Sequence, residues 1–250
     1  MPRPVDFIVI GANKGGTTAL HAYLSEQPAF SVPETKELHF FDDDEGVDWA
    51  APDYRQYHGR FPAGGWDKIV GEATPIYCFW PHSLERIARY NPAVRLVFLL
   101  RDPVERAWSH WKMEFARGNE NNPFAWCIRE GRARLHARSP DGHRRAFSYV
   151  ERGFFGRQLE RIYALFPREQ VRIVRAGDLK SRPDEVMAQL SAFLGAPAPA
   201  PVRPKLVHVA AEIDYGGSTL TPADAAYLRG LYADDDRLLD RLTGISFTSA

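Results

Sequence analysis

The 250-residue sequence has few cysteines, no long apolar run and no excess of charge of either sign. Its two cysteines, Cys78 and Cys127, lack the spacing of metal ligands and form no disulfide framework, so we expect buried thiols. No apolar run approaches the roughly 20 residues that a membrane span needs, and the first residues contain no apolar signal region. We therefore expect a soluble, cytoplasmic protein without a membrane span.

The formal net charge is +0, from 32 Lys and Arg against 32 Asp and Glu. Nucleic-acid-binding proteins usually carry a basic excess, so we expect no nucleic-acid partner and anion recognition through locally placed arginines. No cluster with metal-ligand spacing is present, and no metal is expected. The length and the 44% hydrophobic content suit one α/β domain over residues 1–250, without internal repeats. The oligomeric state is left open.

The stretch from Asp6 to Leu24 predicts a strand, a glycine-rich turn and a helix. Residues 7–10 are apolar and mostly β-branched, and apolar residues from Leu20 onward recur at helical spacing, so the helix begins near Gly16. The backbone N–H groups of its first turn then face the loop and favour an anion such as phosphate. The loop adds glycines, a cation and two hydroxyl donors: Lys14, Gly15, Gly16, Thr17 and Thr18.

This loop differs from the phosphate loop of ATPases and kinases in one position. The pattern GxxxxGK[ST] has a lysine after its second glycine, whereas here Thr17 follows Gly16 and Lys14 lies within the loop. A P-loop kinase is one alternative, although a carboxylate for Mg²⁺ at a strand end is not evident. A noncatalytic nucleotide-binding module is a second alternative.

The segment TKELHFF, residues 35–41, contains a candidate proton acceptor. If the segment is extended, Glu37 and His39 share one face, because side chains alternate along a strand. Burial and neighbouring charges can bring the pKa of either group toward neutrality. The alternative interpretation is a surface loop anchored by Phe40 and Phe41.

The strongest strand signal is VRLVFLL, residues 94–100, and a helix signal follows it directly. Asp102 as N-cap and Glu105 three residues later predict a capping box. Arg101 then lies at the carboxyl end of the strand, and Ser109 lies on the helix surface. The planar guanidinium fork of arginine suits a phosphate.

These segments together resemble the sulfotransferases that use 3′-phosphoadenosine 5′-phosphosulfate (PAPS). KGGTT, residues 14–18, resembles their 5′-phosphosulfate loop. RDPVERAWSHW resembles their 3′-phosphate motif, which implies that Arg101 and Ser109 hold the 3′-phosphate. KELHFF resembles the segment that carries the catalytic glutamate in the heparan-sulfate type, and Glu37 occupies that position.

The resemblance implies a three-layer α/β fold of the P-loop-like kind, with a central parallel sheet of about five strands and helices on both faces. It also implies in-line transfer of a sulfuryl group from PAPS to an acceptor hydroxyl, with 3′-phosphoadenosine 5′-phosphate (PAP) as product. Lys14 would neutralise charge on the bridging oxygen, and Glu37 would be the base with His39 as alternative or helper. The acceptor stays open among glycans, phenols, sterol-like lipids and small natural products.

The sequence departs from the family pattern in three places. Ala73 stands where heparan-type 3-O-sulfotransferases carry a lysine, which weakens a transfer of their polysaccharide specificity. Phe155 replaces a tyrosine and Tyr163 a tryptophan, both mild changes for packing.

Two segments are expected to be loops. Residues 134–146 are rich in arginine and predict a mobile surface loop, which would either be solvated or contact the cofactor or an anionic acceptor. Residues 196–217 predict a connector that covers the nucleotide, with Lys205 as a candidate contact to the 3′-phosphate.

Overall fold

The computed structural model of the protein describes residues 3–135, 141–202 and 215–247. The chain divides into two compact units, each built from two separate segments. The first unit comprises Met1–Leu100 and Arg161–Val207, and the second comprises Arg101–Glu160 and His208–Ala250. That residues 1–250 form a single domain stays a prediction.

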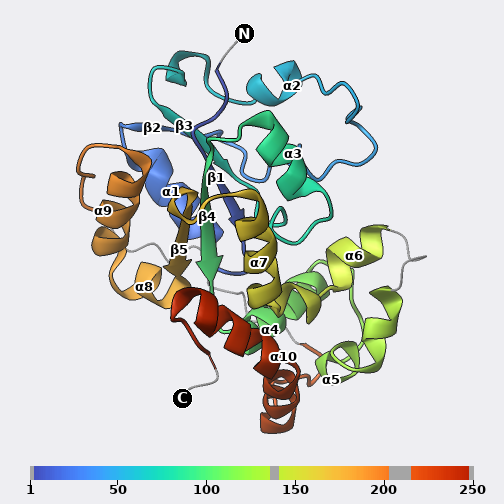
Figure 1. Ribbon diagram of the computed structural model, residues 1–250. Helices are drawn as coiled ribbons and strands as arrows, with labels where there is room; N and C mark the ends of the chain where they lie inside the picture. Colours follow the sequence, from blue (N-terminus) through green and yellow to red (C-terminus); the bar gives the residue numbers. More distant parts are fainter. Residues whose placement is uncertain (1–2, 136–140, 203–214, 248–250) are drawn as a thin grey trace. The chain divides into compact units, whose positions relative to one another are not determined.

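A five-stranded parallel sheet forms the centre of the first unit (Figure 1). Its strand order is β2-β3-β1-β4-β5, and every neighbouring pair is parallel. The strands are β1 (Phe7–Gly11), β2 (Phe30–Ser31), β3 (Ile69–Ala73), β4 (Arg95–Leu100) and β5 (Val171–Arg175). β1 and β4 are buried almost throughout, which explains why their sequences are continuously apolar rather than alternating. The predicted α/β fold with a parallel sheet of about five strands is confirmed.

Helices of the first unit cover the sheet on both faces (Figure 1). These helices are α1 (Thr17–Glu26), α2 (Arg55–His58), α3 (Ser83–Tyr90), α8 (Ala176–Ser181) and α9 (Pro183–Leu194), with 3₁₀ turns at Ala63–Gly65 and Arg168–Gln170. Apolar residues of α1, α8 and α9 share one core with Phe7, Val9 and Leu99 of the sheet. α3 lies on the opposite face and buries Leu84 and Ile87.

The second unit is helical. It contains α4 (Pro103–Ala116), α5 (Phe124–Cys127), α6 (Asp141–Phe147) and α10 (Pro222–Thr243), with 3₁₀ turns at Glu130–Leu135 and Glu151–Gly153, while α7 (Phe155–Leu165) begins in this unit and ends in the first. Its core is largely aromatic and includes Trp111, Phe124, Tyr149 and Tyr232. α6 occupies part of the segment 134–146, so the prediction of a loop is wrong for the residues from Asp141 onward.

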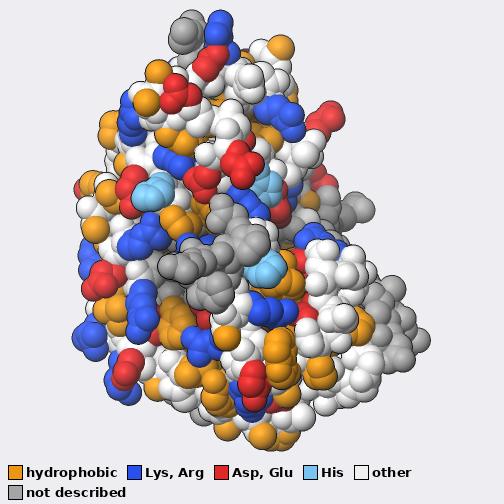
Figure 2. Space-filling view, turned by 90° about the vertical axis from the view of Figure 1, so that its right-hand side faces the viewer, with side chains coloured by type: hydrophobic (Ala, Val, Ile, Leu, Met, Phe, Trp, Pro, Cys, Tyr) orange, Lys and Arg blue, Asp and Glu red, His pale blue; other side chains and the backbone are white. Residues whose placement is uncertain are grey.

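Both cysteines are buried and reduced, as predicted. On the face shown in Figure 2, basic and acidic side chains are interspersed rather than separated into patches of one sign. Within the described ranges, no helix is long and apolar enough to cross a membrane.

Candidate functional site

The glycine-rich loop of the first unit connects β1 to α1 through two residues in left-handed conformation. Lys14 has φ 66° and Gly16, the N-cap of α1, has φ 99°. At Gly15, a Cβ atom would lie 2.8 Å from the carbonyl oxygen of Ala12 and 3.0 Å from that of Leu99. Only glycine fits between these backbone groups, so the loop needs its glycines for steric reasons as well as for the turn.

The first turn of α1 is open to an anion. Within the part of the chain that the structure describes, no side chain caps this helix start and no acidic residue lies in its first turn. Thr17 is buried at the first helical position, and Thr18 is partly exposed. Backbone N–H groups and the helix dipole therefore provide positive potential beside the hydroxyl groups.

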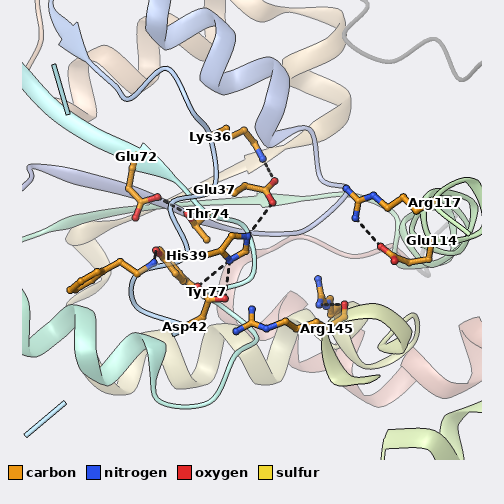
Figure 3. A network of polar contacts seen from close by, with 12 residues as sticks. Lys36, Glu37, His39, Asp42, Glu72, Thr74, Tyr77, Glu114, Arg117 and Arg145 are labelled. Carbon is orange, nitrogen blue, oxygen red and sulfur yellow. Dashed lines mark hydrogen bonds and ion pairs between the residues drawn. The ribbon is translucent and has the colours of Figure 1, made fainter. Parts of the chain in front are cut away.

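A charged network surrounds Glu37 in the same unit (Figure 3). Lys36 Nζ forms an ion pair with Glu37 Oε1, and His39 Nε2 lies 3.6 Å from Glu37 Oε2. The other ring nitrogen of the histidine, Nδ1, lies 2.9 Å from Oδ2 of Asp42, whose side chain is fully buried. The carboxylate of Glu37 thus lies between two cations, and one of these is held by a second carboxylate.

The network separates the pKa values of its members. The Asp42 carboxylate, followed by Glu37, raises the pKa of His39 to about 9, so the imidazole is protonated at neutral pH. Burial raises the pKa of Glu37, but contacts with His39 and Lys36 outweigh it and lower this pKa to about 2. Contrary to the expectation from the sequence, neither pKa moves toward neutrality: at neutral pH Glu37 is ionised and keeps a lone pair for a proton, whereas His39 already carries one.

Backbone strain coincides with the predicted catalytic residues. Among the described non-glycine residues, four have positive φ: Lys14, Glu37, His39 and His82. Three of these four are the residues to which the sequence assigned the chemistry. Left-handed conformations cost free energy in residues with a Cβ atom, and they persist where the surrounding structure determines them, often at functional sites.

Segment 35–41 is not a strand, so the interpretation in which Glu37 and His39 share a face of an extended segment is wrong. The alternative interpretation, a loop, is the one the structure shows, and Phe41 is its buried anchor. Glu37 and His39 have positive φ, 65° and 52°, and in this irregular segment their side chains lie 3.6 Å apart. The backbone N–H of Glu37 donates to the carbonyl oxygen of Ala73 at 3.0 Å. Ala73 ends β3, and the glycine-rich loop follows the end of the neighbouring parallel strand β1. Segment 35–41 and the glycine-rich loop therefore lie at the same edge of the sheet.

The second unit contains the predicted 3′-phosphate residues. Arg101 donates to Glu105 Oε2 at 3.1 Å, and Ser109 lies partly exposed on α4. The Asp102 side chain accepts from the N–H groups of Val104 and Glu105, both at 2.9 Å, which confirms the N-cap. The side chain of Glu105 contacts Arg101, so only this half of the predicted capping box forms.

Arg106 lies within RDPVERAWSHW, and Lys205 is the further residue predicted to contact the 3′-phosphate. Arg106 is fully buried and donates to the carbonyl oxygen of Tyr149, which makes it a packing residue of the second unit. Lys205 lies outside the described residues.

Asp42 and Lys36 are the site residues that the sequence analysis missed. Both flank the predicted pair in KELHFFD, where a carboxylate follows His39 by three residues and a lysine precedes Glu37. The spacing of histidine and aspartate was the available signal, but it brings the two side chains together only in a loop, which was one of two interpretations left open.

Comparison with known proteins connects these features to one family. Residues 4–211 match the family model for the sulfotransferase domain. The chain is 29% identical over 194 residues to human heparan sulfate glucosamine 3-O-sulfotransferase 5, covering 76% of this chain and 53% of that protein. It is 27% identical over 201 residues to the human bifunctional heparan sulfate N-deacetylase/N-sulfotransferase 2, covering 76% of this chain and 22% of that one.

A crystal structure of a sulfotransferase from Alicyclobacillus acidocaldarius superimposes with a TM-score of 0.78 at 26% identity, covering 98% of this chain and 97% of that one. The chain therefore spans about half or less of the length of these two curated relatives, and nearly all of the solved bacterial structure.

Proposed function

Because the chain belongs to the sulfotransferase family, we propose that it transfers a sulfuryl group from PAPS to an acceptor hydroxyl and releases PAP. The observation that carries the proposal is the pairing of an open helix start after a glycine-rich loop with an ionised Glu37 at the same sheet edge. A kinase would need the lysine that this loop lacks after Gly16.

In this proposal the loop holds the 5′-phosphosulfate. The N–H groups of α1 and the hydroxyls of Thr17 and Thr18 bind the phosphate oxygens, and Lys14 neutralises the charge that grows on the bridging oxygen. Arg101 and Ser109 bind the 3′-phosphate, and Lys205 is a further candidate for it. The side chain of Arg101 is 35% exposed while paired with Glu105, so a phosphate can compete with that carboxylate for the guanidinium.

Proton transfer is assigned to Glu37. Its side chain is 38% exposed, so an acceptor hydroxyl can approach the carboxylate from solvent. The low pKa keeps the group ionised, and the protonated His39, held by Asp42, stabilises that state. His39 is therefore a helper in this scheme, since an imidazolium has no lone pair for a proton. As the sulfuryl group leaves the bridging oxygen, the hydroxyl proton moves to the carboxylate.

The acceptor class is a glycan or a small natural product with a free hydroxyl. The named glycan relatives support the first choice, and the absence of a lysine at Ala73 argues against an identical polysaccharide. Because one relative is named as an N-sulfotransferase, amines belong in the acceptor panel beside hydroxyls.

The first test is calorimetric binding of PAP, ATP and AMP without metal, to the wild type and to Arg101→Ala. We expect PAP to bind best and the substitution to weaken PAP by tenfold or more, because a charged hydrogen bond to phosphate contributes about 1.5–3 kcal/mol. The matched control is Arg157→Ala, since Arg157 is an exposed arginine of the same unit. Equal binding of ATP, or binding only with Mg²⁺, would reject PAPS as donor. PAP binding without turnover of PAPS on any acceptor would favour the noncatalytic module.

A further inference from the structure

The backbone of the Glu37–Asp42 segment is hydrogen-bonded to a buried tyrosine, Tyr77. The N–H groups of Phe40 and Phe41 lie 3.1 and 3.4 Å from the hydroxyl oxygen of Tyr77, which accepts from both. Tyr77 itself is fully buried, and Figure 3 shows its side chain beside the network. The two amides belong to the residues between His39 and Asp42, so one hydroxyl fixes the peptide that joins the imidazole to its carboxylate.

A buried carboxylate lies behind that tyrosine. Glu72, in β3, is 1% exposed, and its Oε2 accepts from the hydroxyl of Thr74 at 2.6 Å (Figure 3). Its Oε1 accepts from the hydroxyl of Tyr57 at 3.3 Å. Burial raises the pKa of Glu72 to about 7. The hydroxyls of Thr74, Tyr77 and Tyr57 act in the opposite direction and lower this pKa, but burial outweighs them. A tyrosine hydroxyl that accepts two amide bonds still has its own proton to donate. The hydroxyl of Tyr77 is one of the groups that lower the pKa of Glu72, and Thr74, whose hydroxyl bonds the carboxyl, interacts with both residues.

A carbonyl group of the same segment is also hydrogen-bonded to neighbouring side chains. The carbonyl oxygen of Phe41 accepts from Ser83 Oγ at 3.1 Å and from Arg86 Nη1 at 2.9 Å. With the bond between Glu37 and Ala73, buried or half-buried partners hold the segment at both ends. Non-glycine residues keep a left-handed conformation only where several contacts with the surrounding structure hold them in it.

We propose that Glu72 and Tyr77 are positioning residues for the transfer reaction, which set the orientation of Glu37 through the peptide of residues 40 and 41. The inference rests on the proposed function, because it assigns these residues to the base of that reaction. Tyr77 orients the amides, and Glu72 orients the hydroxyl of Tyr77. Neither residue contacts substrate in this scheme. Displacement of a base by about 1 Å can cost about a hundredfold in rate, so a support of this kind affects turnover without touching the reacting atoms.

The test compares Tyr77→Phe with Tyr90→Phe as a matched control. Tyr90 is also buried in the first unit, and its hydroxyl likewise accepts from a backbone N–H, that of Val5, at 2.9 Å. The Tyr90 hydroxyl also lies 2.8 Å from Nε2 of His58. Both substitutions keep the ring, which in Tyr90 packs against Phe41, and remove the hydroxyl, and of the two hydroxyls that of Tyr77 is the one bonded to the backbone of the segment. Three properties are measured on the full chain: hydrogen exchange of the Phe40 and Phe41 amides, PAP affinity, and PAPS turnover with an acceptor found by screening.

We expect Tyr77→Phe to exchange the Phe40 and Phe41 amides about tenfold faster or more, because these N–H groups lose their acceptor. PAP affinity and the KM for PAPS should stay within twofold, while kcat falls by about tenfold to a hundredfold. Tyr90→Phe should leave the exchange of these two amides and kcat unchanged. Glu72→Gln is the second variant, and it should change exchange and kcat in the same direction, by less than Tyr77→Phe.

Two results would overturn the inference. Unchanged exchange of the two amides would show that Tyr77 does not hold the segment, and faster exchange with an unchanged kcat would show that the support has no role in transfer. A tenfold loss of PAP affinity would indicate general damage instead of positioning. If Tyr77→Phe does not fold, Glu72→Gln decides by the same criteria. A wild type that binds no PAP and turns over no PAPS refutes the proposed function itself, while the exchange measurement still reports on the support of the segment.

Discussion

Asp42→Asn tests the charged network directly. The carboxylate of Asp42 is the largest cause of the raised pKa of His39, at 2.9 Å from Nδ1. Asparagine keeps the size of the side chain and removes the charge. We therefore expect the pKa of His39 to fall below about 9, while Glu37, which remains, still raises it. An NMR titration of the His39 ring protons measures this pKa without any assumption about substrate.

The same substitution predicts a pH-dependent loss of stability. A histidine whose pKa is raised on folding stabilises the folded state below 6.5, and this stability disappears as the pH rises through 9. At 1.36 kcal/mol per pKa unit the full rise would contribute about 3 kcal/mol. The His39 side chain is 46% exposed, and solvent screening reduces the contribution, so we expect Asp42→Asn to cost about 1 kcal/mol at pH 6. The cost should shrink toward pH 10.

Urea denaturation of wild type and variant at pH 6 and pH 10 measures this difference. Asp43→Asn is the control, because its carboxylate accepts from the N–H groups of Glu45 and Gly46 and lies outside the network. A His39 pKa that stays near 9 in Asp42→Asn would refute the assignment of Asp42 as the partner that holds the imidazole protonated. An equal loss of stability at both pH values would refute the electrostatic origin of the effect.

Two further predictions concern the proposed catalytic residues. Glu37→Gln should lower kcat for PAPS turnover by about a hundredfold or more with PAP affinity unchanged, and unchanged turnover in a steady-state assay would remove Glu37 as the base. Gly15→Ala places a methyl group 2.8 Å from the Ala12 carbonyl oxygen. It should destabilise the first unit by about 1–3 kcal/mol in thermal unfolding and weaken PAP in calorimetry, whereas a wild-type melting temperature would contradict the close packing.

The sheet of the first unit could be predicted from the sequence because its strands are continuously apolar. Residues 96–100 and 7–10 are buried, and short apolar runs of this length that end at a turn signal are typical of strands inside a parallel sheet. The glycine-rich loop could also be predicted, since glycine, threonine and the preceding strand are all local signals. The structure confirms the helix start near Gly16 and the N-cap at Asp102 for the same reason.

The geometry around Glu37 could not be predicted from local signals. Left-handed conformations at Glu37 and His39 go against the intrinsic preference of both residues, and they depend on bonds to Ala73 and Tyr77, which are distant in sequence. Local signals left an extended segment and a loop equally open, and tertiary contacts decide for the loop. Arg106 presents the same problem, because its helical spacing gives no indication that a buried carbonyl accepts its guanidinium.

The division into two interleaved units has a consequence for synthesis on the ribosome. The sheet needs β5, which is translated only after Arg101–Glu160 has been made, and the core of the second unit needs Leu228 and Tyr232 of α10. Neither unit can complete its core while the chain is half made, and β4 lacks its outer neighbour β5 while residues 101–170 are translated. Trimming one end of the chain also removes part of one unit without freeing the other.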